Sequence, residues 1–242
     1  MENPSIQIKN LHKSFGDLTA VNDLTLDIAS GELFGLLGVN GAGKTTTIRM
    51  LSCLTKPDSG DAFLGGKSII TESNEVKKII NLSTQETAVA PKLTVRENLE
   101  FMADIYSVSD PKKAVDGVIK NFSLESVLNR KAKTLSGGWQ RKVSIAMALV
   151  TSPRILFLDE PTLGLDVLAR RELWNAIEKM KGKITIILTT HYMEEAEKLS
   201  DRIAVMINGK IAAIGSLAEI EEFSGKKGLE NAFVEIAERS MK

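Results

Sequence analysis

The spacing of apolar residues over the first thirty positions predicts two β-strands. Ile6, Ile8 and Leu11 begin an alternation of apolar and polar positions, and a second alternation over 21–28 ends in a turn at Ser30. A repeat of two residues is that of a strand with one buried face. We therefore expect an antiparallel sheet at the amino terminus.

Apolar runs further along the chain indicate strands that are buried on both faces. The first, 33–37, is apolar apart from one glycine. A helical segment, 45–54, follows it, with apolar residues at helical spacing, namely Ile48, Leu51 and Leu54. Similar patterns predict strands at 79–83, 155–158 and 184–189, a short strand through Phe63 and Leu64, and a hairpin over 202–215 with Asn208-Gly209 at its turn.

Between 93 and 150 the pattern becomes predominantly helical. Thr94 and Glu97 have the spacing of a capping box, and Pro111 is placed to open a second helix. A third helix is expected to begin after Ser136, which is a good N-cap residue.

The order of these elements predicts a single domain, 1–242, of the α/β class. It consists of an α/β core with a mixed sheet, an N-terminal antiparallel β-subdomain and a helical subdomain inserted at about 86–152. Two short helical patterns predict a C-terminal helical tail at about 216–242.

The composition excludes some classes of function. Lysine and arginine together number 31, as do aspartate and glutamate, so no net field favours nucleic acid and no nucleic-acid partner is expected. Cys53, the one cysteine, precludes a disulfide within the chain and is expected to be a small buried hydrophobic residue on the helix. Positions 1–9 lack the apolar core of a signal peptide and no apolar run reaches membrane-spanning length, so we expect a protein that is soluble by itself.

The residues 38–45, Gly-Val-Asn-Gly-Ala-Gly-Lys-Thr, connect a predicted buried strand to a predicted helix. Such a turn directs backbone N–H groups and the positive end of the helix dipole at one point, as a polyphosphate requires. Lys44 adds a charge for the outer phosphates, and the Thr45 hydroxyl is placed to ligate a bridging Mg²⁺. The core is therefore expected to be of the P-loop NTPase type. The candidate phosphate-binding residues are Gly38, Asn40, Gly41, Ala42, Gly43, Lys44, Thr45 and Thr46.

Asp159 and Glu160 follow the buried strand predicted at 155–158. Ligands bind at the carboxyl ends of strands in open α/β sheets, so this pair is expected at the same edge as the phosphate-binding loop. Adjacent strand residues point to opposite faces, which predicts different roles for the two carboxylates. We expect Asp159 to hold the magnesium shell and Glu160 to accept a proton from an attacking water.

A serine and two glycines, Ser136, Gly137 and Gly138, precede a run with apolar residues at helical spacing. A helix that begins in this way can form a second anion site. An ordinary capped helix gives the same pattern, and the spacing by itself leaves both interpretations open.

Four further residues have weaker signals by themselves. His191 follows the carboxyl end of a predicted strand, at the edge of the sheet where the loop 38–45 lies. Asp166 is expected to cap a helix. Phe15 lies in a turn between the first two strands, where a core position is the simplest interpretation, and His12 is expected to be structural.

With these motifs in this order, the chain resembles an ATPase subunit of an ABC transporter. The resemblance rests on the loop 38–45, Gln85, the segment Leu-Ser-Gly-Gly-Trp-Gln at 135–140, which looks like the family signature, the Asp159-Glu160 pair, the Leu165-Asp166 loop and His191. It extends over nearly the whole chain, from Ile6 to Gly215.

The resemblance implies that the cofactors are ATP and Mg²⁺. It implies that Phe15 stacks on adenine, that Gln85 contacts the magnesium and the attacking water, and that His191 touches the γ-phosphate. It also implies that the segment 136–138 completes the site of a second ATPase subunit, identical or not, which pairs head to tail around ATP. Asp166, in the loop along the seam of that pair, joins the candidate nucleotide-binding residues.

Three residues depart from the family pattern. Phe15 stands where tyrosine is usual and keeps an aromatic face. Trp139 occupies a signature position that usually holds a smaller or polar residue, and Leu163 replaces a small residue in the loop along the seam. None of these changes removes a catalytic group, so hydrolysis of ATP is expected.

The stretches 35–47 and 190–197 look most like those of bacterial drug, sodium and antibiotic export ATPases. This resemblance implies a separate integral membrane permease, which docks at Gln85 and the helices from Leu93 onward, and a peripheral location at the cytoplasmic face of a bacterial membrane. The implied cargo is a drug, an antibiotic, an ion or a lipid-like compound. Two alternatives share the catalytic residues: an importer subunit, and a soluble ABC ATPase that remodels nucleic acid or ribosomes.

Overall fold

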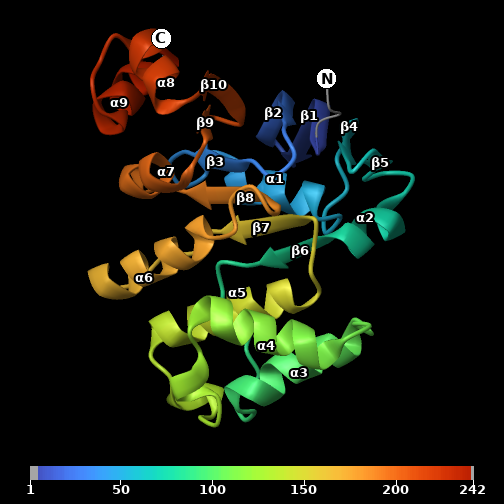
Figure 1. Cartoon of the computed structure of the whole chain (residues 1–242). Helices are drawn as coiled ribbons and strands as arrows, with labels where there is room; N and C mark the ends of the chain where they lie inside the picture. The colour runs from blue at the N-terminus through green and yellow to red at the C-terminus, as the bar shows by residue number, and fades with distance from the viewer. Residues whose placement is uncertain (1–4, 241–242) are drawn as a thin grey trace.

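The computed structural model describes residues 5–240 and contains two β-sheets (Figure 1). A four-stranded sheet has the order β2-β1-β4-β5, and a six-stranded sheet has the order β10-β9-β3-β8-β7-β6. The strands are β1 (Ile6–Phe15), β2 (Leu18–Ile28), β3 (Leu33–Leu37), β4 (Ser59–Leu64), β5 (Lys67–Ser68), β6 (Ile80–Ser83), β7 (Ile155–Asp159), β8 (Thr185–Thr190), β9 (Arg202–Ile207) and β10 (Lys210–Gly215). The helices are α1 (Lys44–Leu51), α2 (Ser73–Ile79), α3 (Val95–Ile105), α4 (Pro111–Phe122), α5 (Gly137–Val150), α6 (Val167–Glu178), α7 (Met193–Leu199), α8 (Leu217–Ser224) and α9 (Leu229–Ser240), with 3₁₀ turns η1 (Glu125–Val127) and η2 (Ala132–Thr134).

The six-stranded sheet is mixed, as predicted. Strands β6, β7, β8, β3 and β9 are parallel, and β10 pairs antiparallel with β9. Every residue of β3 is buried, which explains its apolar run. Leu37 pairs with Thr190 and Asp159 pairs with Thr189, so the carboxyl ends of β3, β8 and β7 meet at one edge of the sheet.

Buried apolar side chains hold the layers together. Phe34 and Phe157, from the six-stranded sheet, pack in one cluster with Ile8 from the antiparallel sheet. The opposite face of the six-stranded sheet contributes Leu158 to a second cluster that also includes Leu173 of α6 and much of α3, α4 and α5. Burial of these side chains is the main favourable contribution to folding.

The helices predicted between 93 and 150 are present and lie together at one end of the molecule (Figure 1). Thr94 and Glu97 form the predicted capping box, in which each side chain accepts a hydrogen bond from the other residue's backbone N–H. Pro111 is the first residue of α4, where its missing N–H has no cost because no helical acceptor precedes it.

The tail helices α8 and α9 lie at the other end of the molecule, beside β10 (Figure 1). Leu229, Phe233 and Ile236 are buried against β9, β10 and α7, as their spacing predicts. None of the helices in residues 5–240 is both long and apolar enough to cross a bilayer.

Three local predictions were wrong. Helix α1 ends at Leu51, because Cys53 takes a left-handed φ of 58° and the Leu54 N–H bonds back to the Arg49 carbonyl. Leu54 is therefore 59% exposed, and Cys53 lies beyond the helix, half-buried. Helix α2 was not predicted. It includes Ile79, so β6 begins at Ile80, one residue later than predicted.

Candidate active site

The loop between β3 and α1 brings its backbone close to neighbouring strands. Gly43 has a φ of 104°, and a Cβ there would meet the carbonyl oxygen of Ala20 and lie 2.7 Å from Met206 Cε. Only glycine fits this position. Gly43 is also the N-cap of α1 and provides no side-chain capping bond, so the first N–H groups of the helix are available to an anion.

A cavity of about 470 Å³ lies over this loop. It brings together residues that are far apart in the sequence, including four of the predicted site residues outside the loop. The lining is Phe15, Leu18, Ala20, Asn40, Gly41, Ala42, Gly43, Lys44, Thr45, Thr46, Gln85, Glu160, Leu163 and His191. A larger cavity, of about 860 Å³, lies near the amino ends of β7 and β8 and contains none of the predicted site residues.

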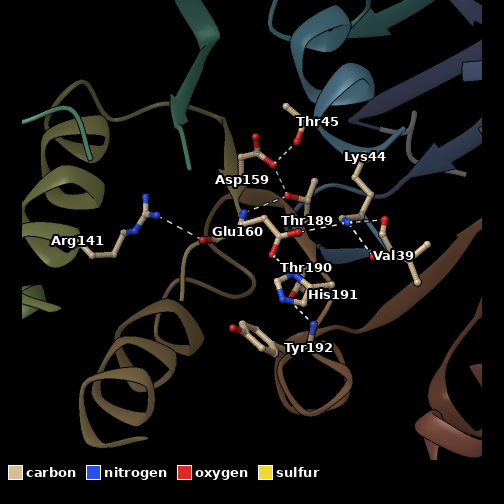
Figure 2. Close-up of polar contacts among 11 residues, drawn as sticks. Val39, Lys44, Thr45, Arg141, Asp159, Glu160, Thr189, Thr190, His191 and Tyr192 are labelled. Carbon is tan, nitrogen blue, oxygen red and sulfur yellow. Dashed lines mark hydrogen bonds and ion pairs between the residues drawn. The ribbon is translucent and has the colours of Figure 1, made fainter. Parts of the chain in front are cut away.

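Lys44, Glu160 and His191 form a connected group in this cavity (Figure 2). Lys44 Nζ donates hydrogen bonds to the carbonyl oxygens of Gly38, at 2.7 Å, and Val39, at 3.2 Å. The same ammonium lies 3.3 Å from Glu160 Oε1, and the other carboxylate oxygen, Oε2, lies 2.7 Å from His191 Nδ1. Both oxygens of the Glu160 carboxylate are therefore held in place.

Asp159 has a different set of partners, although it adjoins Glu160. Its Oδ1 accepts hydrogen bonds from the Thr45 hydroxyl, at 3.1 Å, and from the Thr189 hydroxyl, at 2.5 Å. The two carboxylates are separated as predicted, but strand alternation is not the reason. Asp159 is the last residue of β7, and Glu160 lies beyond it with a left-handed φ of 49°, which turns its side chain toward Lys44.

Phe15 and Gln85 lie at the rim of the cavity. The prediction of a core position for Phe15 was wrong, because its side chain is 53% exposed at the end of β1. Gln85 follows β6 and is also exposed. Lys13 Nζ lies over the Phe15 ring, 5.4 Å from its centroid. An exposed aromatic side chain of this kind is suited to stacking with a planar ring.

Ser136, Gly137, Gly138 and Asp166 lie outside this cavity. The family resemblance implies that the segment 136–138 completes the site of a second subunit and that Asp166 lies at the seam between the two, so their roles stay predictions. Ser136 is the N-cap of α5, but its hydroxyl makes no capping bond in the described chain. Asp166 caps α6 as predicted, with Oδ1 accepting from the N–H groups of Leu168 and Ala169. Gly138 packs closely against α6, since a Cβ added at Gly138 would lie 2.8 Å from the Cβ of Ala169 in that helix.

Two buried charged residues near the site were missed by sequence reasoning. The Arg141 guanidinium donates to the carbonyl oxygens of Gln85 and Glu160. Glu195 is fully buried on α7 and accepts a 3.0 Å hydrogen bond from Trp174 Nε1. Burial is the main cause that lowers the pKa of Arg141 and raises that of Glu195. The sequence did contain a signal for both residues, because each is a charged residue on an otherwise apolar face of a predicted helix.

The arrangement provides the groups that hydrolysis of a phosphoanhydride requires. A buried lysine and a helix N-terminus bind phosphate charge. Thr45 and Asp159 place a hydroxyl and a carboxylate oxygen together, which are the hard ligands that Mg²⁺ prefers. Glu160, at the cavity surface, is a carboxylate that can accept a proton from water.

Comparison with known proteins identifies the family. Residues 21–163 match the model of the family described as "ABC transporter". The chain is 38% identical to the daunorubicin/doxorubicin resistance ATP-binding protein DrrA of Streptomyces peucetius, over 93% of this chain and 69% of that protein. It is 41% identical to the Nod factor export ATP-binding protein I of Rhizobium sp. (strain N33), over 95% of this chain and 77% of that protein. It is also 41% identical to the human phospholipid-transporting ATPase ABCA3 over 87% of this chain, but it spans only 13% of that protein's length.

Solved structures agree with this assignment. An ATP-binding subunit of an ABC transporter superposes with a TM-score of 0.85 at 28% identity, over 96% of this chain and 98% of that one. A dimeric ATP-binding cassette in a post-hydrolysis state, bound to ADP and phosphate, superposes with a TM-score of 0.77 at 28% identity, over 88% of this chain and 98% of that one. The α/β fold of the P-loop NTPase type is thereby confirmed. The chain belongs to the ABC transporter family and carries its ATPase domain.

Proposed function

We propose that this chain is the ATP-hydrolysing subunit of an ABC exporter and that it powers a separate integral membrane permease. The observation that carries the proposal is the group formed by Lys44, Glu160 and His191 at the loop 38–43. It combines a phosphate-binding charge, a base and a residue that orients the base.

The relatives support export. The chain matches most of the length of two bacterial ATP-binding proteins, one named for drug resistance and one for Nod factor export. A phospholipid-transporting ATPase is similar over 13% of its own length. These likenesses favour a drug, an antibiotic, an ion or a lipid-like compound as cargo, and a peripheral location at the cytoplasmic face of a bacterial membrane.

ATP with Mg²⁺ is the proposed form of the nucleotide, and the metal would neutralise phosphate charge when bound. Thr45 and Asp159 are the proposed protein ligands, with Gln85 of the cavity lining as a third contact. Phe15, exposed at the rim, is proposed to stack on adenine.

The residues of this site are proposed to have separate roles in the reaction. Glu160 takes the proton of the attacking water, and the 2.7 Å contact with His191 keeps its carboxylate oriented. Lys44 is proposed to bind the outer phosphates, and His191, which lines the same cavity, is proposed to contact the terminal phosphate.

A second ATPase subunit is the first proposed partner. Ser136 and Gly137 are exposed, lie outside the cavity of their own chain and are proposed to bind the nucleotide of the other subunit in a head-to-tail pair. Beside Asp166, Val167 and Leu168 expose 62% and 73% of their surface. Pairing along this seam would cover those apolar side chains.

The permease is the second proposed partner. Phe101 and Ile105 of helix α3, and Tyr106 directly after it, are each exposed by half or more. They lie on the subdomain that follows Gln85 and β6, so a membrane protein docked there would act on the loop that lines the cavity. Large apolar residues gathered on an exposed helix are typical of a protein interface.

The direct test is co-purification from the native cells. Tagged Glu160→Gln protein would be isolated from membranes solubilised with ATP and Mg²⁺, and its partners identified by mass spectrometry. We expect one stoichiometric integral membrane protein, which the additional substitution Ile105→Glu should remove while ATP binding persists. Recovery of ribosomal or nucleic-acid partners alone, or of none, would contradict the transport proposal, and a permease of importer architecture would contradict export.

A further inference from the structure

Arg141 lies in the second turn of α5, where it is 3% exposed and takes part in no ion pair within residues 5–240. Its guanidinium instead donates to three backbone carbonyl oxygens. Nη1 donates to the Thr84 carbonyl and Nη2 to the Gln85 carbonyl, both at 2.5 Å. Nη2 also lies 3.4 Å from the Glu160 carbonyl oxygen, the contact that Figure 2 shows.

This burial is unfavourable unless the hydrogen bonds compensate for it. A guanidinium removed from water loses its hydration, and burial lowers the pKa of Arg141 accordingly. Among the neighbouring buried positions of α5, Lys142 and Ser144 are polar, whereas Val143 and Ile145 are apolar. An apolar residue at this position could not donate the three hydrogen bonds to the carbonyl oxygens.

The three acceptors belong to two different parts of the active site. Thr84 and Gln85 form the segment that follows β6, and Gln85 lines the cavity. Glu160 is the proposed base. The planar guanidinium carries several N–H donors in a fixed arrangement, so it can hold both segments in one geometry. A lysine ammonium is a compact point charge and lacks this fixed arrangement.

The same residue is rigidly connected to the partner-facing surface. Arg141 is three residues beyond Gly138, about one helical turn, on a helix that begins at Gly137. A displacement of the helix start on contact with a second subunit therefore moves the guanidinium as well. Its hydrogen bonds transmit that movement to Gln85 and Glu160.

We propose that Arg141 is a positioning residue that couples the partner-facing start of α5 to the base and the Gln85 loop of its own site. In a head-to-tail pair this contact makes hydrolysis at one ATP site depend on closure of the other. The inference rests on the pairing proposed above and adds a route for communication between the two sites.

The test is the ATPase activity of the purified chain with Arg141→Lys, which keeps the buried charge and removes the fork. We expect kcat to fall on the order of 10²-fold through misplacement of Glu160, with KM changed less than about threefold. The Hill coefficient for ATP should fall from near 2 to about 1, since coupling is lost. Arg141→Met, of similar length without the charge, should behave in the same way, and either variant that folds decides the question.

Arg202→Lys is the matched control. Arg202 also donates to a backbone carbonyl, that of Asp27, but it lies away from the cavity, so kcat and the Hill coefficient should be unchanged. Unchanged cooperativity in folded Arg141→Lys would overturn the coupling, even if kcat fell. If Glu160→Gln protein stayed monomeric with MgATP, the pairing itself would fail and the coupling with it, so the two failures can be told apart.

Discussion

Lys44 Nζ and Glu160 Oε1 lie 3.3 Å apart, and both side chains are almost fully buried. The charge proposed to bind the outer phosphates and the carboxylate proposed to activate water are therefore electrostatic partners. A phosphate that binds Lys44 competes with Glu160 for the same ammonium. Nucleotide binding therefore directly changes the electrostatic environment of the Glu160 carboxylate, the proposed base.

Glu160→Gln is expected to separate binding from chemistry. The amide cannot accept a proton, so turnover should fall by about 10²–10⁴-fold. Nucleotide affinity should be retained or increased, because the amide competes less strongly for Lys44. ATPase assays and titration with a fluorescent nucleotide measure both quantities. Glu75→Gln, which removes the carboxylate of a surface pair with Lys78, is the control and should change neither. Near-normal turnover in Glu160→Gln would refute the assignment of the base.

His191→Gln is expected to lower kcat on the order of 10²-fold with little change in nucleotide affinity. The reason is the 2.7 Å contact between Nδ1 and Glu160 Oε2, which orients the base. His12→Gln is a natural control, because His12 contacts Ser14 and does not line the cavity. Equal activities of the two variants would show that His191 has no role in the reaction.

Ser136 and Asp166 both occupy N-cap positions, but their alanine variants should differ. Asp166→Ala removes two hydrogen bonds to backbone N–H groups and should lower the free energy of unfolding by about 1 kcal/mol. Ser136→Ala removes no capping bond, so its effect on stability should be within a few tenths of a kcal/mol. Denaturant titration measures both. A large destabilisation by Ser136→Ala would mean that the serine is a structural cap after all.

Glu195 should make stability fall with rising pH. Burial raises the pKa of this carboxyl above its ordinary value of 4.5, so the native chain binds the proton more tightly than the unfolded chain. Stability is therefore lost as pH increases from 4.5 to the native pKa. Glu195→Gln keeps an acceptor for Trp174 and cannot ionise, so the stability of wild type relative to this variant should decline over that window.

Glu219 provides a control of opposite sign. Its pKa is lowered, chiefly by the hydrogen bond from the Ser216 backbone, so its contribution is lost as pH falls through the native pKa. Denaturant titrations of Glu195→Gln and Glu219→Gln at several pH values would compare the two. A difference between wild type and Glu195→Gln that is flat or rises with pH would contradict the account.

Local patterns predicted the elements whose energetics are local. The apolar run of β3, the capping box at Thr94 and the Asn208-Gly209 hairpin each follow from a few adjacent residues. The loop 38–43 and the Asp159-Glu160 pair were recognisable because backbone geometry determines what such sequences can bind.

The predictions that failed depended on contacts distant in sequence or on unusual backbone. Helix α1 stops early because Cys53 adopts a left-handed conformation that no simple pattern indicates. The turn of Glu160 toward Lys44 also requires a positive φ at a non-glycine residue, which is uncommon. Arg141 acquires its role from carbonyl groups 57, 56 and 19 residues away, and periodicity carries no information about these.

Two of these chains are proposed to close around ATP, with the segment 136–138 of each facing the phosphates bound by the other. Sedimentation analysis of Glu160→Gln protein with and without MgATP measures this pairing. We predict a dimer with MgATP and a monomer without it, and a monomer in both conditions when Ser136→Ala is added. A Glu160→Gln chain that binds ATP and remains monomeric, or a dimer that is indifferent to Ser136, would contradict this account.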